Sequence, residues 1–570
     1  MIQSWLKQEL TKRYPGVIFD VSVPPDRKLG DYSTNIAFVL AKRRGKSPVT
    51  LGQEIIGQLQ QDKNMQLMFV EISIIPPGFI NFTLKLDYIR RQLANIHGQG
   101  KKFGRSALGR GKKVIVEYSS VNVAKPMHVG HLRTTLIGDA LANIHDFLGY
   151  KVIRWNYLGD WGTQFGKLIA AYKRWGNKAA VERAPIATLL ELYVRFHEEA
   201  KTDSELENEG QREFKALEEG NAENKKLWQW FRDLSLKEFE IIYNRLGVKF
   251  DVWDGESNYE AELKPLIDFL KNQKLVKESE GAIIFELGVF NLPPALVQKS
   301  DGASLYFTRE IVTLQKRIDE YSPAKIIYVV GNEQSLHFQQ LFAVAKLLGL
   351  EMTELVHVKY GLVLGEDGQK LATREGRIVA AGEVINKAVL LAKKTVSEKS
   401  PSLPEKEKKK IAEVVGIGAL KYNDLMEHRN SDIVFDWKRM LDFAGNSGPY
   451  LQYTYARIAS IRRKAGGSFL RRVLTPNLDL LDHDLELLLM RHLLDFPETI
   501  RQSAEQYVTN NLALYLYELA NIVNRYYETV RILDDKDGNR REARIFLLES
   551  AMAVLDNGLR LLGIQTLERM

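Results

Sequence analysis

The sequence predicts an α/β protein in which a parallel sheet is preceded by a small α+β unit and followed by a helical bundle. Short β-branched runs alternate with helical stripes over residues 113–348, which is typical of parallel βα units. Extended segments and helical spacing share the amino-terminal part, whereas almost everything after Ile433 has helical periodicity. At about 100–200 residues per domain, the 570 residues suffice for three or four domains.

The composition is that of an ordinary globular protein, with 45% hydrophobic and 27% charged residues. The chain has no cysteine, which excludes disulfides, thiolate nucleophiles and zinc sites built on thiolates. No apolar run approaches the roughly 18 residues that a membrane span needs, and the first residues lack the pattern of a secretory signal. We therefore expect a cytoplasmic protein without membrane attachment. The net charge of +8 permits a polyanionic partner without requiring one.

The amino-terminal unit combines helical spacing at Ile2, Leu6 and Leu10 with an extended run at 79–84. Residues 97–113 then place glycines among basic side chains, which indicates a connector. Two interpretations remain open for this connector, a solvated linker and a hinge that contacts phosphates.

The central unit shows strand–loop–helix alternation. The expected strands are 114–116, 152–155 and 325–330. A loop at 122–130 leads into a helical stripe over 132–148, and another helical stretch covers 336–348. The polar, helix-favouring residues from about 173 to 237 read as an insertion in this sheet domain.

The carboxy-terminal part is predicted to be a bundle of helices. Residues 397–410 hold two prolines and dense charge, and we expect them to form a loop that runs into a helix. The candidate helices beyond it are 450–464, 484–504, 511–531 and 541–562.

The sharpest chemical signal is His128-Val129-Gly130-His131, which lies between a strand and a helix. Two imidazoles three residues apart at a helix N-terminus face the same direction, and Gly130 lets a flat group approach the backbone. The helix N-terminus adds free N–H groups and positive potential. This arrangement suits ATP phosphates and charge that develops at the α-phosphate. The alternative is a pair of packed or solvent-exposed histidines, and a metal site lacks a third ligand.

Three further polar residues are expected at the same edge of the sheet. Glu117 ends a strand, Asn122 lies in the following loop, and Lys125 stands three residues before His128. Ligands of open α/β sheets bind at the carboxyl ends of the strands. A carboxylate there can hold an ammonium group, the amide can serve either end of a zwitterion, and Lys125 can neutralise phosphate oxygens.

Residues 117–133 (EYSSVNVAKPMHVGHLR) closely resemble the signature region of arginyl-tRNA synthetases, which belong to class I. The resemblance continues in family order over essentially the whole chain, at residues 156–166, 301–309, 363–376, 445–453 and 567–570. It implies a Rossmann-like parallel-sheet catalytic domain with insertions, preceded by a small α+β domain that contacts the tRNA elbow and followed by an α-helical anticodon-binding domain. The implied bounds are 1–103, 104–430 with an insertion at about 173–237, and 431–570.

The resemblance also implies the reaction. Such an arginine–tRNA ligase, an enzyme of protein biosynthesis, activates L-arginine with ATP to arginyl-adenylate and releases pyrophosphate. It then transfers arginine to the terminal adenosine of tRNA(Arg) and releases AMP. ATP is a substrate, Mg²⁺ is expected with it, no zinc is expected, and the family expectation is a monomer. Because catalysis of this kind is mainly positioning and charge neutralisation, no covalent nucleophile is needed.

The family's functional residues can be carried over to matching positions. The catalytic candidates are Lys125, His128 and His131. The ATP-binding candidates are His128, Gly130, His131, Lys370, Thr373 and Arg374. The arginine-binding candidates are Glu117, Asn122, Glu256, Tyr306, Glu310 and Gln334, with Glu117 and Asn122 at the α-amino and carboxylate end. The tRNA-binding candidates are Asn81, Phe82, Tyr453, Arg457, Tyr527 and Met570.

Two departures from the family pattern affect these assignments. The family usually has aspartate where this chain has Glu310, and the extra methylene moves the carboxylate by more than about 1 Å, so a surface helix carboxylate is the alternative for this residue. The loop at 368–374 departs from the usual K-M-S-K-S pattern, and Ala372 or Thr373 stands where the second lysine belongs. Lys125 would then take over from that lysine. The alternative is an ordinary hairpin loop.

The tRNA-binding candidates also have structural alternatives. Phe82 could belong to the core of the small domain, with Asn81 in a strand. The tyrosines could be core residues of the bundle, because tyrosines at helical spacing usually are. Arg457, Arg462, Arg463 and Lys464 form a basic helix face that could track phosphates or simply be solvated.

Two other function classes were weighed against the ligase. A different nucleotidyl-transferring enzyme could share the histidine motif, but a small-molecule enzyme would not need the long helical domain. A synthetase for cysteine is opposed by the absence of zinc-binding cysteines. A non-catalytic RNA-binding relative would tend to lose the ATP-site residues, whereas His128, His131 and Lys125 are all present.

Overall fold

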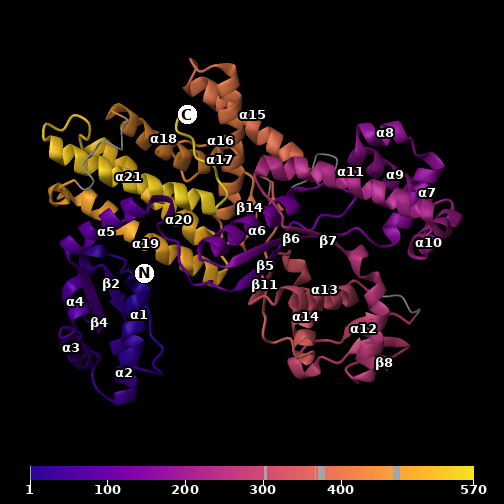
Figure 1. Cartoon of the computed structure of the whole chain (residues 1–570), viewed down its shortest axis with the longest axis horizontal. Coiled ribbons are helices and arrows are strands. Elements are labelled where there is room, and N and C mark those ends of the chain that lie inside the picture. The colour runs from indigo at the N-terminus through magenta and orange to yellow at the C-terminus, as the bar shows by residue number, and fades with distance from the viewer. Residues whose placement is uncertain (1, 301–304, 366–367, 370–378, 467–475) are drawn as a thin grey trace.

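The computed structural model describes residues 2–300, 305–365, 368–369, 379–466 and 476–570. In Figure 1 the central sheet lies between two flanks. The helical bundle and the amino-terminal unit form one flank, and the helices α7–α11 form the other. Among the described residues, no helix is both long and apolar enough to cross a membrane.

The amino-terminal unit packs α2 and α3 on a four-stranded antiparallel sheet of order β1-β2-β4-β3. Ile80, Phe82 and Leu84 of β4 are buried, as expected for a strand with one covered face. The elements are α1 (Ile2–Arg13), β1 (Val21–Ser22), η1 (Arg27–Leu29), β2 (Tyr32–Thr34), α2 (Ile36–Arg44), α3 (Pro48–Leu59), α4 (Lys63–Met68), β3 (Phe69–Ile75), β4 (Phe79–Leu84), α5 (Leu86–Gln99) and η2 (Gly100–Lys102).

The central domain is built on a five-stranded sheet of order β12-β11-β5-β6-β7, in which all pairings are parallel. The strands are β5 (Lys113–Glu117), β6 (Lys151–Leu158), β7 (Val252–Gly255), β11 (Lys325–Tyr328) and β12 (Glu354–His357). The three expected strands are present, and the parallel sheet is confirmed. The strand order reverses direction at β5, so the crevice between the carboxyl ends of β5 and β11 is where such a sheet binds ligands.

Helices cover both faces of this sheet. Val114 and Val116 of β5 belong to the core shared with α6 and the bundle, and Ile115 belongs to the core under α12–α14. The helices are α6 (Val129–Phe147), α7 (Thr163–Trp175), α12 (Glu260–Asn272), α13 (Tyr306–Tyr321) and α14 (Ser335–Leu347), with short η3 (Glu256–Tyr259) and η5 (Asn332–Gln334) at the strand ends.

Two insertions interrupt the sheet domain. The expected helical one consists of α8 (Lys178–Arg183), α9 (Pro185–Glu199), α10 (Ser204–Glu218) and α11 (Ala222–Leu246), which pack with α7 around their own apolar core. The second was not anticipated: β8 (Lys277–Ser279), β9 (Ala282–Phe285), η4 (Gly288–Phe290) and β10 (Ala295–Gln298) form a small antiparallel sheet. Its strands are only three or four residues long, too short for a clear alternation in the sequence.

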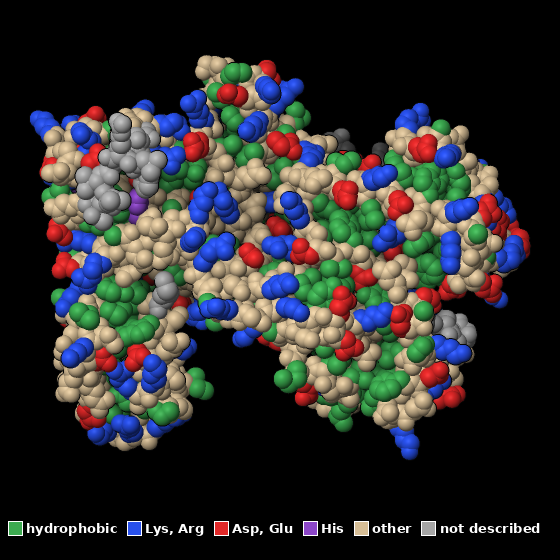
Figure 2. All heavy atoms as spheres, viewed as in Figure 1, with side chains coloured by type: hydrophobic (Ala, Val, Ile, Leu, Met, Phe, Trp, Pro, Cys, Tyr) green, Lys and Arg blue, Asp and Glu red, His purple; other side chains and the backbone are tan. Residues whose placement is uncertain are grey.

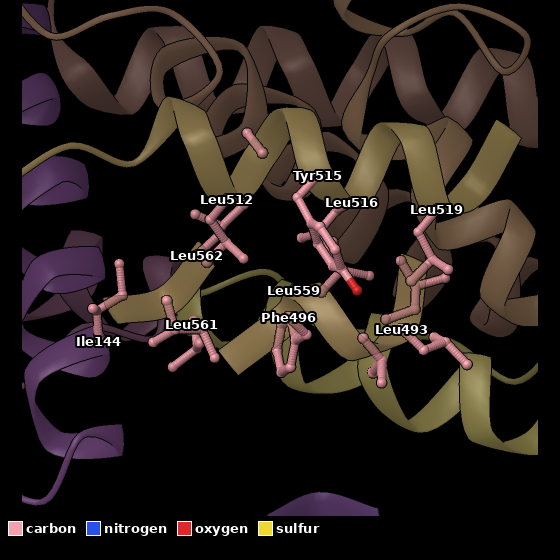
Figure 3. Packing of buried hydrophobic residues seen from close by; sticks show 14 of the residues in the cluster. Ile144, Leu493, Phe496, Leu512, Tyr515, Leu516, Leu519, Leu559, Leu561 and Leu562 are labelled. Atoms are coloured by element: carbon pink, nitrogen blue, oxygen red, sulfur yellow. The ribbon is translucent and has the colours of Figure 1, made fainter. Parts of the chain in front are cut away.

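The carboxy-terminal part is a helical bundle, as predicted. Figure 3 shows Leu493 and Phe496 of α19 packed against Leu512, Tyr515 and Leu516 of α20 and residues of α21. Burial of each such leucine contributes roughly 1.5–3 kcal/mol. The elements are α15 (Ala381–Lys399), α16 (Glu405–Leu425), α17 (Trp437–Met440), α18 (Gly448–Lys464), η7 (Leu478–Leu480), α19 (Asp484–Gln506), α20 (Asn510–Thr529) and α21 (Gly538–Leu561).

The signature helix α6 is where the central domain and the bundle meet. Ile144 of α6 lies beside Leu561 and Leu562 at the end of α21 (Figure 3). Helices α16, α19 and α21 all contact α6. A two-stranded parallel sheet of β13 (Val363–Leu364) and β14 (Ile433–Val434) joins the segments at the same junction.

Candidate active site

A cavity of about 310 Å³ lies at the carboxyl ends of β5 and β11, at the N-terminus of α6. The lining residues are Ser119, Ser120, His128, Val129, Gly130, His131, Arg133, Thr134, Val329, Val330, Gly331, Glu333, Tyr360, Gly361, Leu362 and Val363. Both predicted histidines are therefore in one cavity. A larger cavity, about 1050 Å³, lies between the amino-terminal unit and α19, is lined mainly by apolar side chains and holds none of the predicted residues.

The two histidines cap the helix that they begin. The Nδ1 atom of His128 accepts from the Gly130 N–H at 3.1 Å, and the Nδ1 atom of His131 accepts from the His128 N–H at 3.2 Å. Their ring centroids are 3.7 Å apart. Because each Nδ1 is an acceptor, the neutral form of each ring carries its proton on Nε2. A Cβ on residue 130 would lie 3.0 Å from the His128 ring, so glycine permits this fold-over.

Burial and the neighbouring His128 lower the pKa of His131 to about 3. The ring is therefore neutral at physiological pH. A neutral imidazole with its proton on Nε2 is a fixed hydrogen-bond donor. This donor and the adjacent His128 ring, beside the N-terminus of a helix, form a surface suited to bind phosphate oxygens and to stabilise charge that develops on them.

The predicted arginine-binding residues Tyr306 and Glu310 lie one turn apart on α13. Glu310 is only 1% exposed, so the surface alternative for it is wrong. Neither of its carboxylate oxygens makes a hydrogen bond of standard geometry among the described residues, although the Tyr306 hydroxyl and Arg317 both lower the pKa of the carboxyl. Burial and the nearby Glu117 raise the pKa of Glu310 to about 8. An enclosed acid of this kind requires a cationic partner to ionise.

Glu117 does not stand free at the edge of the sheet. Its carboxylate is buried and forms an ion pair with Arg317 of α13, whose Nη1 lies 2.5 Å from Oε2. The Arg317 guanidinium also lies 4.6 Å from the ring centroid of Trp155 and 5.4 Å from that of Tyr157. Glu117 is thus already paired with a cation inside the protein, and its predicted role at the substrate ammonium stays a prediction.

Glu256 lies at the start of η3, at the end of β7. Burial raises the pKa of Glu256 to about 7, against the lowering effect of Arg309. Asp160, for which no role was predicted from the sequence, holds η3 in place. Its carboxylate accepts from the Ser257 N–H at 3.0 Å, from the Ser257 hydroxyl at 2.9 Å and from Arg232 Nε at 3.1 Å. Glu256 is thus a second buried acidic group, besides Glu310, at the proposed arginine site.

The remaining predicted residues of this region are dispersed around the strand ends. Asn122 is exposed and pairs through its backbone with Gly159, where a Cβ would lie 2.0 Å from the Asn122 Oδ1. Lys125 does not line the histidine cavity, and its ammonium lies 5.3 Å from the ring centroid of Tyr193 in the insertion. Gln334 is exposed at the end of η5, after β11.

Three ATP-binding candidates cannot be placed. Lys370, Thr373 and Arg374 lie outside the described residues. The segments on either side of them are described, and Val129 N–H donates to the Val379 carbonyl at 3.1 Å, so the chain beyond them returns to the signature helix.

Three of the tRNA-binding candidates form one surface cluster on α18 and α20. The Arg457 guanidinium lies 5.0 Å from the ring centroid of Tyr453 and 4.9 Å from that of Tyr527. Arg457 Nη1 donates to Asn524 Oδ1 at 2.6 Å, which fixes its position. Tyr453 and Tyr527 are 37% and 43% exposed. The alternative that they are core residues of the bundle is therefore wrong.

The other tRNA-binding candidates have structural environments. Phe82 has no exposed surface, so its ring cannot stack on a base, and the core alternative is what the structure shows. Asn81 is buried in β4, where it accepts from the Ser33 hydroxyl at 2.7 Å and donates to the Leu29 carbonyl at 2.8 Å. Met570 packs against the small apolar core between α15 and α16.

Two arginines of the predicted basic face are also engaged within the chain. Arg462 Nη2 lies 2.9 Å from Glu568 Oε1, and Arg463 Nη1 donates to the Glu568 carbonyl at 2.8 Å. The face therefore anchors the carboxy-terminal tail as well as presenting charge. Arg457 is the member of the predicted face that joins the tyrosine cluster.

Arg133 and Arg317 are buried arginines whose roles are not predicted from the sequence. Arg133 is 1% exposed two residues after His131, and Arg317 is 1% exposed near the end of α13. Both lie at positions where the helical period places a residue on the covered face. An arginine at such a position is the feature of the sequence that could have indicated a buried guanidinium. A buried guanidinium must be hydrogen-bonded or paired, so such an arginine points to an internal acidic or carbonyl partner.

Three family models match the chain in order. The model described as "Arginyl tRNA synthetase N terminal domain" matches residues 1–84. The model described as "tRNA synthetases class I (R), catalytic domain" matches residues 92–437. The model described as "DALR anticodon binding domain" matches residues 451–570.

Known proteins resemble the chain over its whole length. The arginine–tRNA ligase of Halothermothrix orenii is 41% identical over 552 residues, which cover 96% of this chain and 95% of that protein. The crystal structure of Thermus thermophilus arginyl-tRNA synthetase superposes with a TM-score of 0.85 at 26% identity and covers 100% of both chains. That of the Plasmodium falciparum enzyme gives a TM-score of 0.83 at 28% identity, covering 100% of this chain and 98% of the other.

Proposed function

The chain belongs to the arginyl-tRNA synthetases, the class I ligases that join arginine to tRNA(Arg) with ATP as a substrate, and from that premise we propose where each substrate binds. ATP occupies the cavity at His128 and His131. The side chain of arginine lies against Tyr306, Glu310 and Glu256, with Asn122 and Gln334 at the rim. The terminal adenosine of the tRNA approaches the same opening, and the tRNA body reaches the cluster around Arg457.

The reaction in this site proceeds in two displacements. A carboxylate oxygen of arginine attacks the α-phosphorus of ATP, the bond to the β-phosphate oxygen breaks, and pyrophosphate leaves. A ribose hydroxyl of the terminal adenosine then attacks the carbonyl carbon, the bond to the phosphate oxygen breaks, and AMP leaves. Charge grows on phosphate oxygens in the first step. The Nε2 atoms of His128 and His131, left free by the Nδ1 contacts, would donate to those oxygens, and the His131 ring would do so as a neutral donor.

The observation that carries the arginine assignment is the unsatisfied Glu310 carboxyl. This carboxyl is 1% exposed and makes no hydrogen bond of standard geometry among the described residues; the Tyr306 hydroxyl and Arg317 do not offset the cost of its burial, so a further cation would stabilise its ionised form. Arg317 is already neutralised by Glu117. A guanidinium from the substrate would supply donors in a planar fork that matches a carboxylate.

Several further points rest on this proposal. Mg²⁺ enters with ATP, and among the described lining residues of the cavity Glu333 supplies a carboxylate, which fits an ion held mainly by phosphates and water. Lys125, Lys370, Thr373 and Arg374 act on the phosphates. The enzyme works as a cytoplasmic monomer without zinc. Its domains are residues 1–103, 104–430 and 431–570, for the tRNA elbow, catalysis and the anticodon.

A pyrophosphate-exchange assay with each of the twenty amino acids, with and without tRNA(Arg), tests the proposal. Among the twenty amino acids, we expect only arginine to support exchange. We expect this exchange to be lost in the variant Glu310→Gln at low arginine concentration. Glu205→Gln, an exposed change on the insertion, is the matched control and should behave as the wild type. Exchange with lysine in preference to arginine, or an unaltered arginine KM in Glu310→Gln, would contradict the assignment.

A further inference from the structure

Arg133 occupies an unusual position on the signature helix. Its side chain is 1% exposed, and its two terminal nitrogens donate to four backbone carbonyls. Nη1 lies 2.9 Å from the Gly361 oxygen and 2.8 Å from the Leu362 oxygen. Nη2 lies 3.1 Å from the Arg429 oxygen and 2.8 Å from the Ser431 oxygen. All four hydrogens of these two nitrogens are thus used.

The four carbonyls belong to two segments that are far apart in the sequence. One segment leads into β13 and the other leads into β14, and these strands pair in parallel. Residues 360–363 of the first segment line the same cavity as the two histidines. One side chain therefore joins the histidine-bearing helix to another part of the wall of that cavity.

The fifth donor of Arg133 faces a buried acid. Nε lies 3.7 Å from Oδ1 of Asp424 on α16. Burial raises the pKa of Asp424 to about 7, and Arg133 opposes this rise. Two further buried charges belong to the same two helices. Lys421 of α16 and Asp139 of α6 each favour the charged state of the other, and the Lys421 ammonium donates to the Gly563 carbonyl at 2.7 Å. Neither residue lines the cavity.

We propose that Arg133 is a positioning residue for the nucleotide, which sets the distance between the signature histidines and the backbone wall at residues 360–363. The inference rests on the proposed place of ATP in this cavity. Only a guanidinium offers two nitrogens with two hydrogens each in a rigid plane. A lysine at this position would carry three donors on one atom and could not hold both segments. Without the fork, the wall would move relative to the histidines while the α6–α16 packing remained.

The variant Arg133→Met with Asp424→Asn separates positioning from charge pairing. Removing Arg133 alone would leave Asp424 buried and unpaired, which destabilises the fold for an unrelated reason. The double variant removes both charges. We expect the KM for ATP in pyrophosphate exchange to rise on the order of 10-fold to 10²-fold, the scale of a small misplacement of a bound reactant. The KM for arginine should change less than about twofold.

The matched control is the neighbouring pair, in the variant Asp139→Asn with Lys421→Met. It removes two buried, oppositely charged groups of the same two helices, neither of which lines the cavity. We expect a lower unfolding temperature and an unchanged KM for ATP. An equal rise of that KM in the control, or no rise in the Arg133 double variant, overturns the proposal.

A conservative variant keeps the test decisive if the double variant does not fold. Arg133→Lys retains the charge beside Asp424 but loses the fork, so the KM for ATP should still rise. Wild-type ATP affinity in a folded Arg133→Lys overturns the proposal. His131→Ala is measured in parallel: if it leaves turnover unchanged, the nucleotide assignment itself fails, whereas a normal loss there with unaltered Arg133 variants rejects only the role of Arg133.

Discussion

At the residue scale, the proposed arginine site makes the ionisation of Glu310 the step that would govern arginine binding. Glu310 is buried beside Glu117, and both effects raise its pKa. The empty site therefore holds the carboxyl in its neutral form at pH values where a surface carboxyl is ionised. In the proposed site the guanidinium of arginine would bind the ionised form, so binding would release a proton.

We predict that the affinity for arginine rises with pH up to the pKa of Glu310, near 8. Below that pKa the carboxyl must lose a proton before it can pair with the guanidinium, and the KM for arginine should fall by up to about tenfold per pH unit. Steady-state exchange between pH 6 and 9 measures this. Glu310→Gln should show a high and pH-independent KM. A KM in the wild type that rises with pH contradicts the assignment.

His131 gives the second prediction at this scale. His131→Ala should lower turnover by at least about 10²-fold, the effect of losing a donor aimed at developing charge. The unfolding temperature should change little, because the ring caps only the first turn of α6. Its pKa is lowered to about 3, so the ring stays neutral through the assay range and no activity loss between pH 8 and pH 6 should arise from it. Turnover close to wild type in the variant excludes the proposed role.

At the scale of elements, α18 and α20 together build a surface that neither has alone. Tyr453 and Arg457 are one turn apart on α18, and Tyr527 comes from α20. Arg457 lies between the two tyrosine rings, where it is held by Asn524. Exposed aromatic rings around a fixed guanidinium can stack on unpaired bases.

We predict that Arg457→Ala weakens tRNA(Arg) binding by about tenfold or more, since stacking contacts contribute about 1–3 kcal/mol per base. Filter binding or fluorescence titration measures the Kd, and arginine-dependent steps without tRNA should be unchanged. Arg463→Ala is the matched control on the same helix, because that side chain is engaged with the Glu568 carbonyl. Equal losses in the two variants would argue for nonspecific charge instead of a base-contacting cluster.

At the scale of the whole molecule, the positions of the domains would allow one tRNA to contact several of them. The amino-terminal unit and the bundle lie on the same side of the central sheet (Figure 1). Lys and Arg side chains are spread over the face shown in Figure 2, and several of them gather where the bundle meets the central domain. The net charge is +8. A polyanion that runs along this face would displace counterions at many points.

We therefore predict a steep dependence of tRNA affinity on salt. If six or more phosphates are contacted, the affinity should fall by on the order of 10³-fold between about 50 and 200 mM salt. Titrations at four salt concentrations give the slope of log K against log salt. The KM for arginine, a contact made inside a buried site, should change much less. A flat response of the tRNA affinity would be incompatible with phosphate tracking.

Some features of this protein follow from the sequence alone. The three-part architecture and the parallel sheet could be predicted, because helical and strand periodicity are local properties of the sequence. The histidine pair could be predicted because its two members are close in sequence. Tyr306 and Glu310 could be paired for the same reason, since a four-residue spacing places them on one face of α13. The cluster of Tyr453 and Arg457 also follows from one helical turn.

The tertiary structure decided which charges are satisfied. Arg133 reaches carbonyls that lie 228 to 298 residues further along the chain, and Glu117 is neutralised by Arg317 from another element. The sequence cannot distinguish a carboxylate that awaits a ligand from one already paired inside the core, because that difference depends on which face of the sheet each strand end presents and which helix covers it. Burial likewise removed Phe82 from the surface. The local sequence determines which chemical group stands at each position. Long-range packing determines which of these groups are paired inside the protein and which can bind a substrate.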